Sequence, residues 1–522
     1  MRAKSLFALF SFILLPSAFC FEFRAYWVDT FHTPLGTHAE IDRVIELATE
    51  SHANAIFVEV RRRGDSWYLD SKEPLTEVAG VGEPDANGKW TFDPLRYIIE
   101  RAHAKSIQVH AFVIVGAIWR GDELPKDPNH VFLQHVWDAA NNRPYSGARQ
   151  WATRSLQGRI RSGDDYYIDL GHPAAASYTI EVLLHLLSAY DLDGIHLDRT
   201  RYPENVGANV GYNEVSVARF NAKYGTTGLP RPNDPRWRQW RRDQVTNFVR
   251  RFYLHATALK PSLIVSAALV AWSNGPRASG GFDETDAYAN VFQDWQSWLN
   301  EGIIDVACPM LYKREHVLRE RKQFDDWLSF TINTAHATGR LAIAGIGAYM
   351  NGIEGTLRQG RRSRTAGADG ILMFAIGDTA PWSTADNSTN TAVRRNPYYA
   401  PAPGTATPKR PNEDFVTAVS SGVNARGTLR FEPRSAMPIF SLDEPAPQKP
   451  LRETGSVMGY TQTDGETVTI ESATHESFST VTDGSGFFGF VQLAPGEYHI
   501  GACAVTVTAS RVIRIDLPCT NR

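Results

Sequence analysis

Between residues 21 and 380, short apolar runs alternate with longer segments whose apolar residues recur at helical spacing. This alternation is typical of βα units, in which each helix connects two parallel strands of one sheet. The runs that predict strands are 23–28, 55–61, 108–115, 194–197, 264–270, 306–311, 341–346 and 370–376. Eight strands with seven clear intervening helices predict an α/β protein built on a (β/α)8 TIM barrel. The eighth helix is the weakest element, because its candidate stretch, 383–398, is short and polar.

Local signals mark where several of the helices begin. Thr37 and Glu40 have capping-box spacing before a helix expected over 38–51. Asp234 and Pro235 suit the N-cap and first position of another helix. On its core side we expect Trp237, Trp240, Phe248 and Phe252. Further helices are expected over 93–105, 173–190, 287–301 and 353–366, a short strand over 166–170, and a long insertion over roughly 116–165.

The stretch 190–203, YDLDGIHLDRTRYP, contains the strongest candidate for a functional residue. Strand alternation puts Ile195 and Leu197 on one side and His196 and Asp198 on the other. Asp198 ends the strand, and α/β barrels keep their chemistry at the C-terminal ends of their strands. Two interpretations stay open at this point: Asp198 is functional, or it caps the next segment or pairs with a neighbouring arginine.

A second pointer to a polar barrel mouth lies in the second strand. Alternation there turns Ile56, Val58 and Val60 toward the helices and Phe57, Glu59 and Arg61 toward the interior. Two opposite charges inside a barrel are costly unless they are paired or used, so we expect them to have a partner or a task.

The first twenty residues have the pattern of an export signal. Arg2 and Lys4 precede the apolar run 6–15, and small residues follow around a plausible cleavage point. The run is too short to span a membrane comfortably, so we expect a cleaved signal and a periplasmic or extracellular protein. An oxidising compartment permits Cys503 and Cys519 to pair, whereas Cys308 lies in an apolar strand and is expected to be buried.

The chain changes character after residue 400. Prolines mark 401–450 as a linker, within which 412–440 could either dress the barrel or start the next domain. Short strands and tight turns over 451–522 predict a small antiparallel β-sandwich. The expected organisation is therefore a signal at 1–20, a barrel at 21–400, the linker, and the sandwich.

Several motifs of the barrel region resemble those of one known family. They are RAYWV at 24–28, NAIFVEVR at 54–61, Gly64-Asp65, YIDLGHP at 167–173, DGIHLD at 193–198, and Tyr202-Pro203. They are similar to those of the family-ten-like glycosyl hydrolases, bacterial exported (β/α)8 barrels. The resemblance covers most of 22–380 and implies hydrolysis of glycosidic bonds, in some members in peptidoglycan strands. The tail, through TDGSGF at 482–487 and LAPGEY at 493–498, resembles the carboxypeptidase regulatory-like sandwich, which implies a fold and a docking role rather than an activity.

The chain departs from the family pattern at two places. The family usually has two consecutive acids after the fourth strand, and here the second position is Arg199. It also tends to have an Asn-Pro turn after the third strand, where this chain has Val115-Gly116-Ala117. At the motif positions Asp198, Arg61 and Asp65 match.

Glycoside hydrolysis normally needs two carboxyl groups, one to protonate the leaving oxygen and one to attack or to activate water. We expect Asp198 to be the nucleophile or charge stabiliser, kept ionised by Arg61 or Arg201. For the acid partner Glu315 is the first candidate, followed by Glu59 or Glu284. Candidate substrate-binding residues are Arg61, Asp65, Arg201, Tyr202, Trp272 and Tyr312.

The loss of the second acid motivates an alternative function, a carbohydrate-binding barrel of the cell envelope without catalysis. No cofactor is expected, and no metal, because His110 and His196 lack accompanying ligand spacing and fit satisfied core histidines better. The net charge of −3 gives no general attraction to nucleic acid or anionic membranes. The expected partner is a polysaccharide substrate; the sequence does not determine the oligomeric state.

Overall fold

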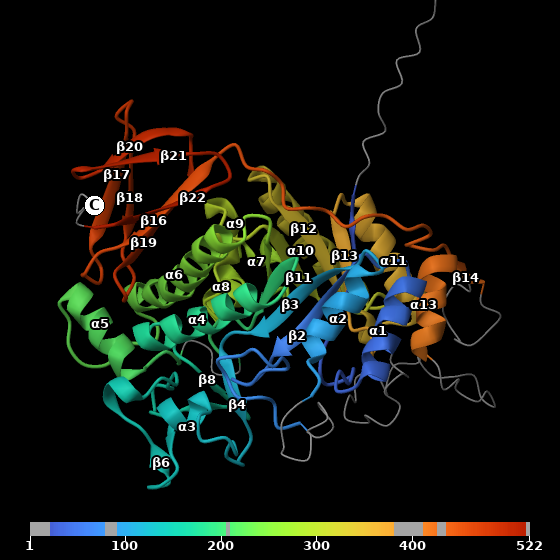
Figure 1. Cartoon of the computed structure of the whole chain (residues 1–522), viewed down its shortest axis with the longest axis horizontal. Coiled ribbons are helices and arrows are strands. Elements are labelled where there is room, and N and C mark those ends of the chain that lie inside the picture. Colours follow the sequence, from blue (N-terminus) through green and yellow to red (C-terminus); the bar gives the residue numbers. More distant parts are fainter. Residues whose placement is uncertain (1–20, 79–90, 205–208, 380–410, 425–434, 518–522) are drawn as a thin grey trace, which may run out of the picture.

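A computed structural model describes residues 21–78, 91–204, 209–379, 411–424 and 435–517. Its centre is a closed barrel of eight parallel strands in the order β1-β13-β12-β11-β10-β9-β3-β2 (Figure 1). The strands are β1 (Phe23–Val28), β2 (Ala55–Arg61), β3 (Gln108–Ile114), β9 (Gly194–Asp198), β10 (Ile264–Leu269), β11 (Val306–Leu311), β12 (Leu341–Gly347) and β13 (Gly370–Phe374). The predicted TIM barrel is confirmed.

Helices surround the barrel, and two of them, over 214–224 and 318–337, were not among the helices predicted from the sequence. The helices are α1 (His38–Glu50), α2 (Pro94–His103), α4 (Pro173–Ala189), α5 (Glu214–Tyr224), α6 (Pro235–Leu259), α9 (Trp295–Glu301), α10 (Leu318–Ala337) and α11 (Ile353–Thr365). The capping box of Thr37 and Glu40 is present, and Asp234 caps α6 with Pro235 in its first turn. The four aromatic residues predicted to lie on the core side of α6 are all buried.

The helix expected over 287–301 is interrupted, and this part of the prediction is wrong. The chain forms α7 (Pro276–Ser279), a 3-10 turn η2 (Phe282–Glu284), α8 (Asp286–Ala289) and only then α9. Between α8 and α9, the side chain of Gln293 accepts a hydrogen bond from Val270 N at 2.7 Å and donates one to Ala268 O at 3.2 Å. The break therefore lets a buried amide satisfy backbone groups at the end of β10.

Two apolar layers hold the barrel together. Ile56, Val58 and Val60 belong to the layer between strands and helices, while Trp27, Phe57 and Cys308 belong to the layer inside the barrel. His196 lies inside as well, accepting from Trp27 Nε1 at 3.1 Å and bonding Ser266 Oγ at 2.9 Å. It is a satisfied core histidine, as expected, and burial lowers its pKa to about 3.

The insertion after β3 forms small antiparallel sheets outside the barrel. Its elements are β4 (Ala117–Arg120), α3 (Val131–His135), β5 (Trp137–Asp138), β6 (Arg143–Pro144), the 3-10 turn η1 (Gly147–Arg149), β7 (Arg161–Ser162) and β8 (Asp165–Tyr167). The strand expected over 166–170 thus ends at Tyr167 and pairs with β4. Beyond it, Asp169 accepts hydrogen bonds from Gly171 N and Ser216 Oγ, both at 2.9 Å, and these bonds hold the chain in a turn.

A late segment fills the place of the eighth helix. The candidate 383–398 lies outside the described residues, but α13 (Pro411–Ser421) packs against α1 and α11. Phe415, Val416 and Val419 of α13 are 0% exposed and join the layer between strands and helices. Short strands β14 (Val423–Asn424) and β15 (Ser435–Ala436) follow, and a 3-10 turn η3 (Ala348–Met350) precedes α11. Part of the ambiguous stretch 412–440 therefore dresses the barrel.

Residues 437–452 cross the N-terminal ends of the barrel strands. Arg24, at the start of β1, pairs with Glu444 at 2.8 Å, and Gln108, at the start of β3, donates to Pro447 O at 3.3 Å. Ala446 is 6% exposed and belongs to the interior layer of the barrel. In Figure 1 this orange-to-red segment passes along one end of the barrel, and the cyan insertion lies at the other.

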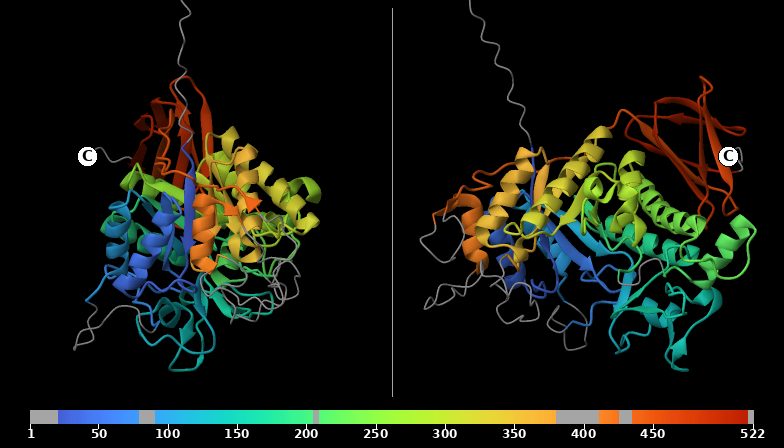
Figure 2. Two further views of the ribbon diagram at one scale, coloured as in Figure 1. Left: turned by 90° about the vertical axis from the view of Figure 1, so that its right-hand side faces the viewer. Right: turned by 180° about the vertical axis from the view of Figure 1, so that it is seen from behind.

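The C-terminal domain is a two-sheet sandwich that rests on α6 (Figure 2). Its strands are β16 (Gly455–Tyr460), β17 (Thr467–Ser472), β18 (Ser477–Val481), β19 (Phe487–Leu493), β20 (Gly496–Ile500), β21 (Cys503–Val507) and β22 (Val512–Asp516). The sheet orders are β19-β16-β22 and β18-β17-β20-β21, and all pairs are antiparallel except β16 with β22. Cys519, the predicted partner of Cys503, and the predicted signal at 1–20 lie outside the described residues.

Candidate functional site

Asp198 is the last residue of β9 and opens toward the C-terminal mouth of the barrel. Its side chain is half-buried, and its Oδ1 accepts a hydrogen bond from Arg199 N at 2.6 Å. Burial raises the pKa of Asp198, although the guanidinium groups of Arg201 and Arg199 oppose this shift. The same position therefore combines a partly accessible carboxyl with two cations that favour its charged form.

Arg199 stands where the family usually has a second acid. Its side chain links the end of β9 to the insertion through hydrogen bonds. Its backbone is left-handed at a φ of 48°, and its Nη1 donates to Asp165 Oδ2 at 2.9 Å and to Tyr167 Oη at 2.8 Å. A Cβ on Gly116 would lie 2.7 Å from the carbonyl oxygen of Arg199. Glycine at 116 thus permits the close approach that seats Arg199, so the two departures from the family pattern meet in one place.

Arg201 forms part of the same loop. It is 6% exposed, pairs with Glu204, and lies with its guanidinium carbon 5.0 Å from the ring centroid of Trp272. Burial opposes ionisation of Glu204, but the charges of Arg201 and Arg199 lower its pKa overall. Arg201 and Trp272 are thus brought together, and Arg201 shares its charge between Glu204 and Asp198.

Glu59 lies between the ends of β1 and β2. It is 1% exposed, and its Oε2 accepts from Thr30 N at 2.8 Å and from Thr30 Oγ1 at 2.5 Å. Burial raises the pKa of Glu59 to about 7, against the lowering effects of Thr30 and Arg62. A carboxyl group in this environment exchanges a proton near neutral pH, as a general acid or base must.

Aromatic rings line the mouth beside these carboxyl groups. Trp27 lies 6.2 Å from Tyr312 and 5.8 Å from Phe374, measured between ring centroids, and Tyr349 lies 5.9 Å from Tyr312. Burial raises the pKa of Tyr312 well above its usual range, with smaller contributions from Tyr349, Asp198 and Asp29. The charges of Asp198, at the end of β9, and of Asp29, just after β1, therefore both act on the phenol of Tyr312.

The mouth also contains three residues that were not predicted as site residues from the sequence: Asp29, His32 and Asp378. His32 Nδ1 is 3.0 Å from Asp29 Oδ2, and His32 Nε2 is 3.7 Å from Asp378 Oδ2. The hydrogen bond to Asp29 raises the pKa of His32, with burial acting against it. The only sequence signal for these residues was their position, because Asp29 directly follows β1 and Asp378 comes four residues after the end of β13.

Arg61 does not follow the strand alternation inward. The β2–β3 register shifts between Glu59 and Arg61, and Arg61 forms a bidentate pair with Glu73, with both N–O distances at 2.7 Å. Both side chains are 0% exposed, and Tyr178 of α4 donates to the same carboxylate at 3.3 Å. Arg61 is therefore buried on the helix side of the barrel rather than beside Asp198, and the expectation that it faces the interior is wrong.

Glu315 also points away from the mouth. It follows β11, but its Oε1 is 2.7 Å from Arg362 of α11 and 3.9 Å from Arg321 of α10. Burial raises its pKa while Arg362 and Arg321 oppose the shift. These partners place Glu315 between two outer helices, so the structure does not bring it together with Asp198. Glu284, the further candidate, is exposed in η2.

The other two substrate-binding candidates have backbone and core partners. Tyr202 is 3% exposed and donates to Asp169 Oδ1 at 3.3 Å in the layer between strands and helices. Asp65 is 7% exposed and accepts from Arg63 N at 3.0 Å within the turn after β2. The residues gathered at the mouth are thus Asp198, Glu59, Arg201, Trp272 and Tyr312, joined by Asp29, His32 and Asp378.

Within the described residues, no cluster of three or more His, Cys, Asp or Glu side chains has the arrangement of a metal site. None of the helices in those ranges combines the length and apolar character needed to cross a membrane.

Comparison with known proteins gives one family. The model of the family described as "Glycosyl hydrolase-like 10" matches residues 22–342. Glycosyl hydrolase YngK of Bacillus subtilis (strain 168) is 23% identical over 266 residues, which cover 50% of this chain and 46% of YngK. Glycosyl hydrolase DigH of Escherichia coli (strain K12) is 24% identical over 275 residues, which cover 50% of this chain and 54% of DigH. The match thus spans about half the length of each curated relative.

The chain is also similar in fold to solved structures. The PgaB (BpsB) glycoside hydrolase domain from Bordetella bronchiseptica has a TM-score of 0.47 at 15% identity, covering 72% of this chain and 98% of that one. The catalytic domain of β-amylase from Paenibacillus polymyxa has a TM-score of 0.47 at 11% identity, covering 68% of this chain and 92% of that one.

Proposed function

The chain belongs to the glycosyl hydrolase-like 10 family, and from this we propose that it is an exported glycosidase that cleaves a polysaccharide at the C-terminal mouth of its barrel. The observation that carries the proposal is a pair of carboxyl groups in unlike surroundings near the C-terminal ends of β2 and β9, two strands that are separated in the barrel by β3. Asp198 is half-buried beside two guanidinium groups, and Glu59 is buried with a pKa of about 7. Burial raises the pKa of both groups, and two guanidinium groups oppose the shift at Asp198; carboxyl groups in such unlike surroundings are suited to acid and base roles.

In this mechanism Glu59 holds the proton that passes to the glycosidic oxygen as the bond to the leaving sugar breaks. Asp198 acts as the carboxylate, either attacking the anomeric carbon or taking a proton from the water that attacks it. Arg201 and Arg199 offset part of the effect of burial, which disfavours negative charge on Asp198. Tyr312 and Trp272, which are partly exposed, offer ring faces and edges to sugar rings near these groups.

The substrate class follows from the expected export and from the family. A cleaved signal would deliver the enzyme to the periplasm or outside the cell, where glycan strands of peptidoglycan are an abundant polysaccharide. We therefore propose peptidoglycan glycan strands as the first substrate to test, with other envelope polysaccharides next.

The test is the release of reducing ends from purified glycan strands by the mature protein. Asp198→Asn should lower turnover by about 10²-fold or more, because it removes the ionisable carboxylate. Asp191→Asn is the matched control, since Asp191 is an exposed acid before the same strand. Equal activity in the wild type and Asp198→Asn would exclude Asp198 from catalysis.

The pH dependence tests the role of Glu59. Turnover by the wild type should fall as the pH rises above about 7, because Glu59 then loses the proton it must donate. In Glu59→Gln the residual activity should lack this alkaline decline. An unchanged alkaline limb in Glu59→Gln would assign the acid role to another group.

One observation favours the alternative, a carbohydrate-binding barrel without catalysis. The position after Asp198, where the family usually has a second acid, is Arg199, whose guanidinium is held by Asp165 and Tyr167. Glycan binding by calorimetry without new reducing ends over long incubation would favour this alternative over hydrolysis.

A further inference from the structure

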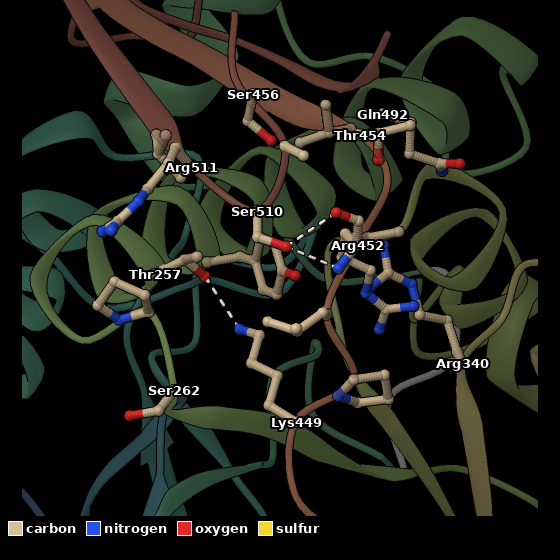
Figure 3. A pocket seen from close by; sticks show the side chains of 18 of the residues that line it. Thr257, Ser262, Arg340, Lys449, Arg452, Thr454, Ser456, Gln492, Ser510 and Arg511 are labelled. Atoms are coloured by element: carbon tan, nitrogen blue, oxygen red, sulfur yellow. Dashed lines mark hydrogen bonds between the residues drawn. The ribbon is translucent and has the colours of Figure 1, made fainter. Parts of the chain in front are cut away.

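A cavity of about 490 Å³ lies where the barrel, the segment 437–452 and the sandwich meet (Figure 3). The barrel contributes the end of α6 and the loops before β10, β11 and β12; the segment contributes 448–452; the sandwich contributes parts of β16, β19 and β22. It lies at the N-terminal end of the strands, because Asp305 and Arg340 directly precede β11 and β12. The cavity is therefore at the opposite end of the barrel from Asp198.

The lining of this cavity is strongly cationic. Arg340, Lys449, Arg452 and Arg511 line it, and among the described residues around it no acidic side chain does. Three of these cations converge on one carboxylate beneath them, Asp305, which is 1% exposed. Asp305 lies 3.3 Å from Arg340, 3.0 Å from Lys449 and 3.4 Å from Arg452. One carboxylate therefore forms ion pairs with three cationic side chains.

Within the described residues, the positive charges of this cluster exceed the negative charge that compensates them. Arg340 and Arg452 both reach Asp305 Oδ1, and Figure 3 shows their side chains meeting on one side of the cavity. Burial and the charge of Arg340 lower the pKa of Arg452. The Nε groups of Arg340 and Arg452 are buried and have no hydrogen-bond partner there. Buried donors without partners are costly, and an oxyanion that entered between these two side chains would give them a partner.

The rest of the lining is polar and sized for a small molecule. Thr257, Ser262, Ser456 and Gln492 place hydroxyl and amide groups around the same space. Its volume is within the range of about 300–1,000 Å³ that small-molecule sites usually have. Arginine forks are the side chains that best match carboxylate and phosphate groups.

We propose that this cavity binds a sugar-sized ligand bearing an oxyanion, either a carboxylate or a phosphate group. The oxyanion takes the hydrogen-bond donors of Arg452, Arg340 and Arg511, and the polar lining takes the ligand's hydroxyl groups. Because the ligand contacts barrel, segment and sandwich together, its binding also stabilises the docked arrangement. The proposal is independent of the chemistry at the mouth.

The test measures thermal unfolding and calorimetric affinity of the full mature chain with glucuronate, glucose 6-phosphate and glucose at matched ionic strength. We expect saturating glucuronate or glucose 6-phosphate to raise the Tm by roughly 2 °C or more, and glucose to leave it unchanged. A response to glucuronate alone identifies a carboxylate ligand, and a response to glucose 6-phosphate alone identifies a phosphate ligand.

Variants assign the response to the cavity. Arg452→Gln should weaken anion affinity by about tenfold or more, since it removes a charged donor while Arg340 and Lys449 still pair with Asp305. Arg511→Gln leaves the Asp305 cluster intact and should also weaken affinity, so the test holds even if Arg452→Gln is unstable. Arg231→Gln, an exposed site elsewhere, should bind as the wild type does. No anion-specific rise in Tm, or equal affinity in the wild type and both cavity variants, would overturn the proposal.

Discussion

At the residue scale, the three carboxyl groups predicted as catalytic occupy three different environments. Glu59 is buried and accepts hydrogen bonds from Thr30. Asp198 is partly exposed, and two guanidinium groups lie near it. Glu315 lies between outer helices and pairs directly with an arginine. Identical functional groups therefore differ in proton affinity through their surroundings. These surroundings lead us to assign the acid role to Glu59 rather than Glu315.

The pKa of Glu59 makes a stability prediction. Its pKa is raised from 4.5 to about 7 in the folded chain, so the native state binds more protons than the unfolded state between these values. Wild-type stability from this group therefore falls as the pH rises through that window. Glu59→Gln cannot ionise, so its stability relative to the wild type should increase by up to about 3 kcal/mol between pH 4 and pH 8.

Urea denaturation at several pH values measures this difference. Glu50→Gln, at an exposed glutamate in α1, is the control for removing one glutamate charge. A pH-independent difference for Glu59→Gln would mean that Glu59 is not protonated near neutral pH in the folded protein.

At the element scale, single irregularities in a strand or helix change which side chains face which neighbour. In β2 the alternation holds through Glu59, and the register shift then turns Arg61 to the helix side, where Glu73 binds it. At the break between α8 and α9, the side chain of Gln293 accepts a hydrogen bond from Val270 N at the end of β10. In α13, an element distant in sequence closes the helical layer between α11 and α1.

The contribution of α13 is testable with one pair of variants. Phe415→Ala should destabilise the protein by about 3–5 kcal/mol, because Phe415 is 0% exposed between α13 and the barrel. Thr417→Ala, on the exposed side of the same helix, should change stability by no more than about 0.5 kcal/mol. Similar small effects for both variants in urea unfolding would show that α13 does not complete the helical layer.

At the scale of the whole molecule, barrel and sandwich form one interlocked body. The sandwich contacts α6 through Phe487, whose ring centroid lies 5.6 Å from that of His255. It contacts α5 through Asp464, which pairs with Arg219 at 2.7 Å. The segment 437–452 closes the N-terminal end of the barrel through Arg24, Gln108 and Asp305. The segment 437–452 therefore packs against the barrel and does not act only as a flexible linker to the sandwich.

Truncation separates these contributions. A chain of residues 21–400 lacks α13 and the closing segment, and we expect it to lose cooperative thermal unfolding because Ala446 no longer covers the interior. A chain of residues 21–452 keeps both and should unfold cooperatively at a lower Tm than the full chain. Circular dichroism on heating measures this, and cooperative unfolding of 21–400 at the Tm of 21–452 would contradict it.

The sequence by itself determined the order and type of the barrel elements, because the period of apolar residues is a local property of each segment. It also determined that Asp198 ends the fourth barrel strand, since strand position follows from the same pattern. Only the tertiary structure decided the partners of Arg61 and Glu315, the gathering of Glu59, Asp29 and His32 at one mouth, and the cation cluster over Asp305. These depend on contacts between residues far apart in the chain, on a one-residue register shift and on burial, and none of these can be read from local spacing.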